Sequence, residues 1–148
     1  MLLEETEGAH RSLPIFVGAN EATAIAFALQ GVELPRPMTH DLMTQLLETF
    51  GARLDRVVVT KLVESTFFAE LRLIGTAGDH AISCRPSDGI ALALRTHSPL
   101  YVADDLMDAE GLVIEPDEDD VSDNANPEEI VGEFREFLDR VRPEDFSG

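Results

Sequence analysis

The sequence predicts an α+β domain, with a mixed, largely antiparallel sheet, small-residue helices packed on it, and a C-terminal amphipathic helix. Two β-rich runs, residues 56–63 and 66–74, are separated only by Glu64 and Ser65, which is the pattern of an antiparallel hairpin. Alanine-rich segments follow short apolar runs, and their small side chains allow a helix to lie close to a sheet. An apolar stripe at helical spacing follows Pro127.

Short strands and capped helices are expected to alternate before the hairpin. Residues 2–3 could finish a strand whose beginning is absent, and the apolar run 13–17 predicts a second strand closed by Gly18. Asn20 is expected to cap a helix that ends at Gly31, and Thr39 to cap one that ends at Gly51. The second of these helices carries a full apolar stripe: Leu42, Met43, Leu46, Leu47 and Phe50.

The elements after the hairpin are short and lead into one conspicuous turn. Residues 80–85 predict a strand that passes directly into a helix ending near Thr96 or His97. Residues 100–102 predict another strand, and residues 104–111 one or two helical turns.

The domain boundaries follow from composition. Residues 1–114 are expected to form one domain, 115–126 an acidic linker, and 127–148 a C-terminal helix and tail. Asn126 and Pro127 suit the start of that helix, whose apolar face requires a partner. The helix either folds back on its own domain, which we favour, or binds another subunit or a different protein.

The net charge of -18 lies mostly in the second part of the chain. Residues 1–103 carry 12 acidic and 8 basic residues (net -4), and residues 104–148 carry 17 and 3 (net -14). Because non-specific affinity for nucleic acid comes mainly from Lys and Arg, this balance argues against a broad nucleic-acid surface. A local site stays open, since ten of the eleven basic residues are Arg, which can hold a phosphate through two hydrogen bonds.

A single cysteine, Cys84, excludes a disulfide within the chain and is interpreted as a small buried apolar residue. No stretch approaches the ~20 apolar residues of a membrane span, and no N-terminal targeting pattern is visible. We therefore expect a cytoplasmic protein without a membrane partner.

Acidic residues recur at the expected helix starts, at Glu21, Asp41 and Asp88. Their structural explanation is the helix dipole, which an acid in the first turn complements by about 0.3 to 1 kcal/mol. The functional explanation requires Asp41 and Asp88 to converge in space. They would then hold a divalent cation, Mg²⁺ or Mn²⁺, that activates water for attack on a phosphodiester.

His40 is the best general-base candidate, because it stands at a helix entrance beside an acid. Arg85 could bind a phosphate just before a helix start, where free backbone N–H groups also favour anions. The structural alternatives are a hydrogen-bonded cap residue for His40 and an ion pair with Asp88 or Asp41 for Arg85.

Several ordered blocks, residues 13–18, 21–22, 31–33, 36–42, 66–69 and 85–93, together resemble the bifunctional nuclease (BFN) domain family. Residues 128–146 resemble the C-terminal extension of its actinobacterial members. The sequence departs from the family in two places. Gly89 stands where the family usually has Ala, at an expected cost below ~1 kcal/mol, and the family's Val-rich first strand is absent.

The resemblance implies an α+β domain that self-associates, a dimer being favoured, and a nuclease acting on RNA and DNA with low sequence specificity. The motif positions that would carry catalysis are His40, Asp41, Arg85 and Asp88, supported by Glu21 and Ser87. The alternative is a non-catalytic oligomeric module, in which the same residues cap helices and the acidic tail recruits or regulates a protein partner.

Overall fold

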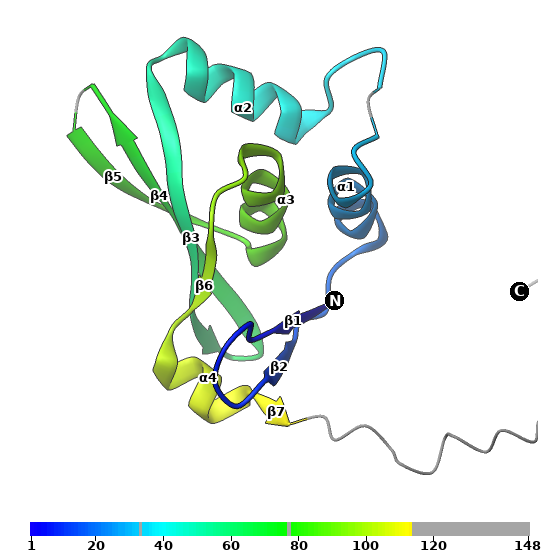
Figure 1. Ribbon diagram of the computed structural model, residues 1–148, viewed down its shortest axis with the longest axis vertical. Coiled ribbons are helices and arrows are strands. Elements are labelled where there is room, and N and C mark those ends of the chain that lie inside the picture. Colours follow the sequence, from blue (N-terminus) through cyan, green and yellow to red (C-terminus); the bar gives the residue numbers. More distant parts are fainter. Residues whose placement is uncertain (33, 77, 114–148) are drawn as a thin grey trace, which may run out of the picture. The chain divides into compact units, whose positions relative to one another are not determined.

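The computed structural model describes residues 1–32, 34–76 and 78–113 (Figure 1). The expected linker 115–126 and the expected helix and tail 127–148 lie outside the described residues. The α+β class is confirmed, with helix and strand in similar amounts and a mixed, mainly antiparallel main sheet. The elements are β1 (Leu2–Glu4), β2 (Arg11–Pro14), α1 (Ala19–Leu29), α2 (Thr39–Thr49), β3 (Ala52–Val63), β4 (Thr66–Gly75), β5 (Gly78–Cys84), α3 (Pro86–Thr96), β6 (Leu100–Val102), α4 (Asp104–Glu110) and β7 (Leu112–Val113).

The main sheet has the strand order β5-β4-β3-β6. β3 and β4 form the expected hairpin, and β6 joins β3 in parallel. The hairpin turn consists of Glu64 and Ser65, both with positive φ (47° and 61°), as a two-residue turn between twisted strands requires. The hairpin prediction is therefore confirmed, with β3 starting earlier than expected.

Three helices, α1, α2 and α3, lie on one side of the main sheet, with α3 between the other two (Figure 1). Leu92 on α3 and Val57 on β3 are fully buried where helix and sheet meet. Gly89 permits this close approach, because a Cβ built there would lie 2.7 Å from Cγ1 of Val57. The small residues of α3 thus set its distance from the sheet, and this fixes the position of its first turn.

A second, three-stranded sheet with the order β1-β2-β7 was only partly expected. The predicted strand 13–17 is wrong in its bounds, since β2 covers Arg11–Pro14. Ile15 still bonds to Met1, because its N–H donates to the Met1 carbonyl oxygen at 2.9 Å and its carbonyl oxygen accepts from the Met1 amino group at 3.1 Å. The next residue, Phe16, is 97% exposed.

The helix caps differ from those expected. Gly18, Met38 and Arg85 are the N-caps of α1, α2 and α3, so that Asn20 and Thr39 are already helical. At α2 the reason is visible, because the Asp41 carboxylate accepts a hydrogen bond from the Met38 N–H at 2.7 Å and so serves the helix start from inside the helix.

The apolar stripe of α2 is only half buried. Met43 and Leu47 pack into the core, whereas Leu42, Leu46 and Phe50 are exposed. None of the helices within residues 1–113 is long and apolar enough to cross a membrane.

Candidate active site

A cleft of about 690 Å³ lies where the first turns of α1, α2 and α3 meet the end of β5. Four of the polar residues singled out in the sequence line it: Glu21, His40, Arg85 and Asp88. They come from three helices far apart in the chain, and the fold brings these four side chains together. The functional interpretation also requires Asp41 to converge with Asp88, and Asp41 does not line this cleft. Leu71, Ile82 and Leu92 provide an apolar wall.

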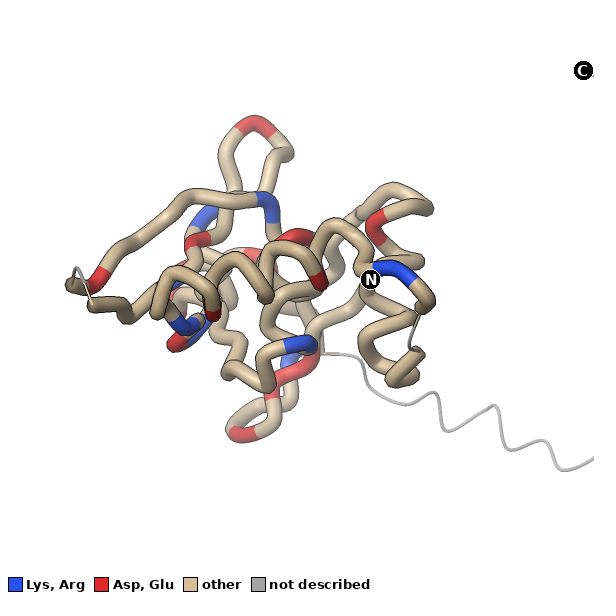
Figure 2. Tube along the Cα trace, turned by 90° about the horizontal axis from the view of Figure 1, so that it is seen from above, with Lys and Arg blue, Asp and Glu red and all other residues tan. Residues whose placement is uncertain are grey.

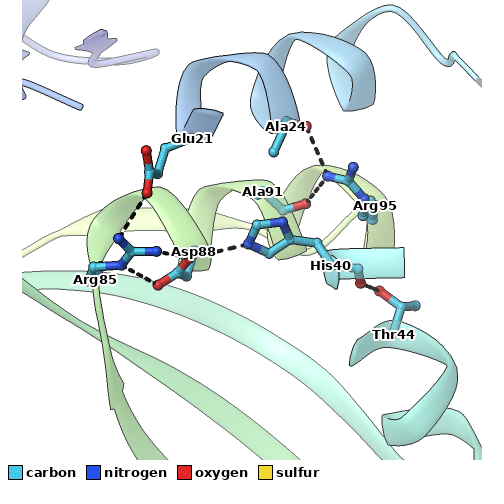
Figure 3. A network of polar contacts seen from close by, with 8 residues as sticks. All are labelled: Glu21, Ala24, His40, Thr44, Arg85, Asp88, Ala91 and Arg95. Atoms are coloured by element: carbon cyan, nitrogen blue, oxygen red, sulfur yellow. Dashed lines mark hydrogen bonds and ion pairs between the residues drawn. The ribbon is translucent and has the colours of Figure 1, made fainter. Parts of the chain in front are cut away.

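Arg85 is the centre of the polar network in this cleft (Figure 3). Its Nε and Nη2 donate to the two carboxylate oxygens of Asp88 at 2.8 and 2.9 Å, and its Nη1 donates to Oε1 of Glu21 at 2.9 Å. The Arg85 side chain is nevertheless 64% exposed. The guanidinium therefore joins the starts of α1 and α3 and still faces solvent.

His40 lies on the other side of Asp88 and is buried. Its Nε2 is 3.3 Å from Oδ1 of Asp88 (Figure 3). With a proton on Nε2, the ring donates to the carboxylate and leaves Nδ1 as a free base. The Thr44 hydroxyl donates to the His40 carbonyl oxygen at 3.0 Å.

The charges around Asp88 favour its ionised form. The hydrogen bonds from Arg85 lower the pKa of Asp88, which partial burial alone would raise, and the bond to His40 lowers it further. The same contacts raise the pKa of Arg85. Figure 2 shows the Lys and Arg positions interleaved with Asp and Glu along the described trace. Arg85 thus stays protonated between the carboxylates of Glu21 and Asp88.

Asp41 belongs to a different polar group. Nε of Arg95 donates to its Oδ1 at 2.5 Å, and this bond lowers the pKa of Asp41. Arg95 also donates to the carbonyl oxygens of Ala24 and Ala91, so it ties α2 to α1 and α3. Asp41 does not line the 690 Å³ cleft.

Arg95 is the residue that sequence reasoning missed. Its position seven residues after Asp88 on α3 puts both side chains on one face of the helix, which is the signal that could have found it.

The described residues contain no group of three or more His, Cys, Asp and Glu side chains placed to hold a metal ion. Asp41 and Asp88 are each hydrogen-bonded to an arginine, Arg95 and Arg85 respectively. This donor set, as arranged, does not fit a cation shared by the two carboxylates, and their metal role stays a prediction.

Two further residues that the sequence singled out, Ser87 and Cys84, lie near the cleft. Ser87 is buried in the first turn of α3 and lines a neighbouring hollow instead of the cleft. Cys84 lines the cleft, but burial raises the pKa of its thiol to about 11, with a further contribution from the charge of Asp88. The thiol is therefore neutral near pH 7 and unsuited to act as a nucleophile.

Comparison with known proteins identifies the family of the chain. Residues 1–115 match the family described as the bifunctional nuclease domain. The chain is 43% identical over 146 residues to an uncharacterized protein of Mycobacterium tuberculosis, covering 99% of this chain and 87% of that protein. It is 30% identical over 115 residues to bifunctional nuclease 1 of Arabidopsis thaliana and 28% over 116 residues to bifunctional nuclease 2 of Oryza sativa subsp. japonica. Each plant match covers 76% of this chain but only 35% of the plant protein.

Proposed function

Because the chain belongs to the bifunctional nuclease domain family, we propose that it hydrolyses phosphodiester bonds in RNA and DNA with low sequence specificity. The observation that carries this proposal is the chain of contacts from His40 through Asp88 to Arg85 in one cleft. It combines a base, a residue that orients the base, and a cation for the phosphate. These are the parts that phosphodiester hydrolysis requires of a protein.

His40 would act as the general base. Asp88 holds the imidazole by one ring nitrogen, so that the other can take a proton from water as the water oxygen attacks phosphorus. The bond from phosphorus to the leaving oxygen then breaks, and solvent supplies the proton that this oxygen needs. Asp88 is a positioning residue in this scheme, since it acts through His40.

Arg85 would bind the phosphate that is attacked. Its contacts with Asp88 and Glu21 use Nε–H and one N–H of each terminal nitrogen. The second N–H of each terminal nitrogen is left for phosphate oxygens. Glu21 accepts a hydrogen bond from the guanidinium and would support it from α1.

Metal assistance belongs to this proposal as a separate element. A Mg²⁺ or Mn²⁺ ion would need Asp41 or Asp88 to exchange an arginine for the cation, since both carboxylates are paired. No step described above passes through such an ion. Assays with each metal and with a chelator therefore test metal dependence independently of the roles of His40 and Arg85.

The test compares purified variants on single-stranded RNA and DNA. His40→Ala is expected to lower kcat/KM by roughly 10² to 10⁴-fold, the usual contribution of a general base. Asp88→Asn should lower kcat mainly, and Arg85→Lys should weaken substrate binding because the bidentate fork is lost. His80→Ala is the matched control, because His80 is an exposed histidine on β5 that does not line the cleft.

Activity that survives unchanged in both His40→Ala and Asp88→Asn would refute the catalytic assignment and indicate a contaminating nuclease. All variants are purified by one route, and their circular dichroism is compared, so that a loss of folding is not taken for a loss of chemistry.

A second candidate function, a non-catalytic oligomeric module, is favoured by the outer face of α2. Leu42, Leu46 and Phe50 recur at a spacing of four and are 49%, 46% and 75% exposed. A stripe of this kind on a helix is suited to a second copy of the chain or to another protein. Leu46→Glu should then reduce the mass measured in solution by light scattering, whereas an unchanged mass would remove this stripe from assembly.

A further inference from the structure

A second hollow adjoins the cleft and shares Arg85 and Glu21 with it. Its volume is about 400 Å³, within the roughly 300 to 1,000 Å³ of pockets that hold small organic groups. The loop after β2, the β3–β4 turn and the start of α3 form its walls. Arg85 therefore stands between two connected spaces, one of which holds His40 and Asp88.

Phe16 is an aromatic residue in the wall of this hollow. It lines the hollow together with Phe67, and the residue is 97% exposed. Single exposed apolar residues are ordinary on protein surfaces. Here, however, Phe16 lines the same hollow as the exposed Arg85, and the residue before it, Ile15, is bonded to Met1.

On the basis of the proposed nuclease function, we propose that this hollow is a nucleobase subsite for single-stranded RNA or DNA. Phe16 stacks on a base while the adjoining phosphate reaches Arg85. The hydroxyls of Ser65 and Thr66, which also line the hollow, can donate or accept at the base edge. Since a hydroxyl suits either kind of edge, such a subsite accepts every base, which agrees with low sequence specificity.

The charge of the protein supports stacking as the main source of affinity. With a net charge of -18, the chain cannot rely on many phosphate contacts. Stacking on an aromatic ring is independent of charge and tolerates any base. A single phosphate contact through Arg85 predicts a shallow salt dependence, with log K falling about 0.7 per unit of log salt for a single strand.

Stacking as the main source of affinity also excludes a duplex as the preferred ligand. Bases inside a duplex have both faces covered by their neighbours, so a ring at the protein surface cannot reach them unless a base is extruded. Binding should therefore be weaker for a duplex than for either of its separate strands.

The absence of tryptophan from the sequence provides a direct test. Phe16→Trp places a single fluorophore in the hollow, and Phe50→Trp places one at another exposed position, directly after α2, that lines neither space. Each variant is titrated with a 2′-O-methyl phosphorothioate oligonucleotide, which resists cleavage, as a single strand, as a duplex and with abasic sites. We expect the single strand to quench Phe16→Trp and not Phe50→Trp, with little quenching by the duplex or the abasic strand.

Phe16→Ala gives the matching loss. It should weaken binding of a labelled single strand roughly five- to hundredfold in fluorescence anisotropy, the usual effect of removing one stacking ring. The inference is overturned if the strand binds without quenching Phe16→Trp. It is also overturned if the Trp emission shifts to the blue with protein concentration alone, because a second copy of the chain then covers the ring.

These measurements do not depend on cleavage. If the wild-type protein cleaves, and Phe16→Ala cleaves and binds as well as the wild type, the subsite is refuted and the nuclease function is not. Quenching and binding without any cleavage refute the nuclease function and keep the subsite.

Discussion

Replacing Gly89 by Ala tests how closely α3 must approach the sheet. In most helices this substitution is stabilising, by up to about 1 kcal/mol in the interior and less in the first turn, where Gly89 lies. Here the new Cβ would lie 2.7 Å from Cγ1 of Val57 and 3.4 Å from Sγ of Cys84. Val57 is fully buried on β3, so its side chain cannot move aside into solvent.

The magnitude follows from these two opposing effects. Overpacking by a methyl group in a filled core costs typically about 1 to 3 kcal/mol, and the gain in helix propensity offsets roughly half a kcal/mol of this. We expect the free energy of unfolding to fall by about 0.5 to 2.5 kcal/mol. The assay is urea unfolding followed by circular dichroism at constant pH.

A double-mutant cycle makes the reasoning refutable. Val57→Ala alone leaves a cavity, but combined with Gly89→Ala it gives the new methyl group room. The coupling should therefore be favourable by about 1 kcal/mol or more, well above the ~0.3 to 0.5 kcal/mol scatter of independent sites. Additive effects, or a stabilised Gly89→Ala single variant, would show that close packing does not explain the glycine. Gly75→Ala, whose nearest contact would be 3.4 Å, is the control.

Three further predictions concern the polar groups. With its pKa raised to about 11, the Cys84 thiol should react with a disulfide reagent at pH 8 at least about a hundredfold more slowly than a free cysteine, and unfolding in urea should restore the rate. Arg95→Met should lower the free energy of unfolding by about 1.5 to 3 kcal/mol, because Asp41 loses its ion pair and keeps only the bond from the Met38 N–H, and two helix carbonyl oxygens lose their side-chain donor. The exposed Arg36→Met should be neutral in thermal melts. The pKa of Asp41 is lowered from its ordinary value of 3.8, so its ionised form stabilises the fold above about pH 4 and this stability is lost as the pH falls through the folded pKa. Asp41→Asn should accordingly flatten the fall in melting temperature below pH 4, and an unchanged slope would contradict the assignment.

The sequence allowed prediction of those elements whose signals are local. The β3–β4 hairpin is defined by its alternation and by two turn residues, and α3 by a proline at its start and small residues within it. The second sheet could be predicted only in part, because β7 has two residues and depends on pairing with β2, a strand far away in the chain. The half-exposed stripe of α2 shows the same limit, since periodicity reports that a face is apolar and not what covers it.

The candidate site shows the limit most clearly. Glu21, Asp41 and Asp88 look alike in the sequence, each an acid in the first turn of a helix. In space Glu21 and Asp88 share Arg85, whereas Asp41 pairs with Arg95 at the other end of α3. These pairings depend on how α1 and α2 pack against α3, and no local pattern in the sequence encodes that packing.

The pairing of Asp41 with Arg95 also changes how a loss of activity in an Asp41 variant should be interpreted. The bond between Asp41 and Arg95 holds the first turn of α2 against α3, and His40 is the neighbouring residue in that turn. Removing the Asp41 carboxylate would therefore displace the imidazole from Asp88 even if Asp41 never binds a metal. A metal ligand and a positioning residue differ in one measurable respect: loss of a ligand raises the Mg²⁺ or Mn²⁺ concentration needed for activity, whereas displacement of His40 lowers kcat at every metal concentration. Arg95→Met decides between them, because it disturbs the same turn without removing any carboxylate.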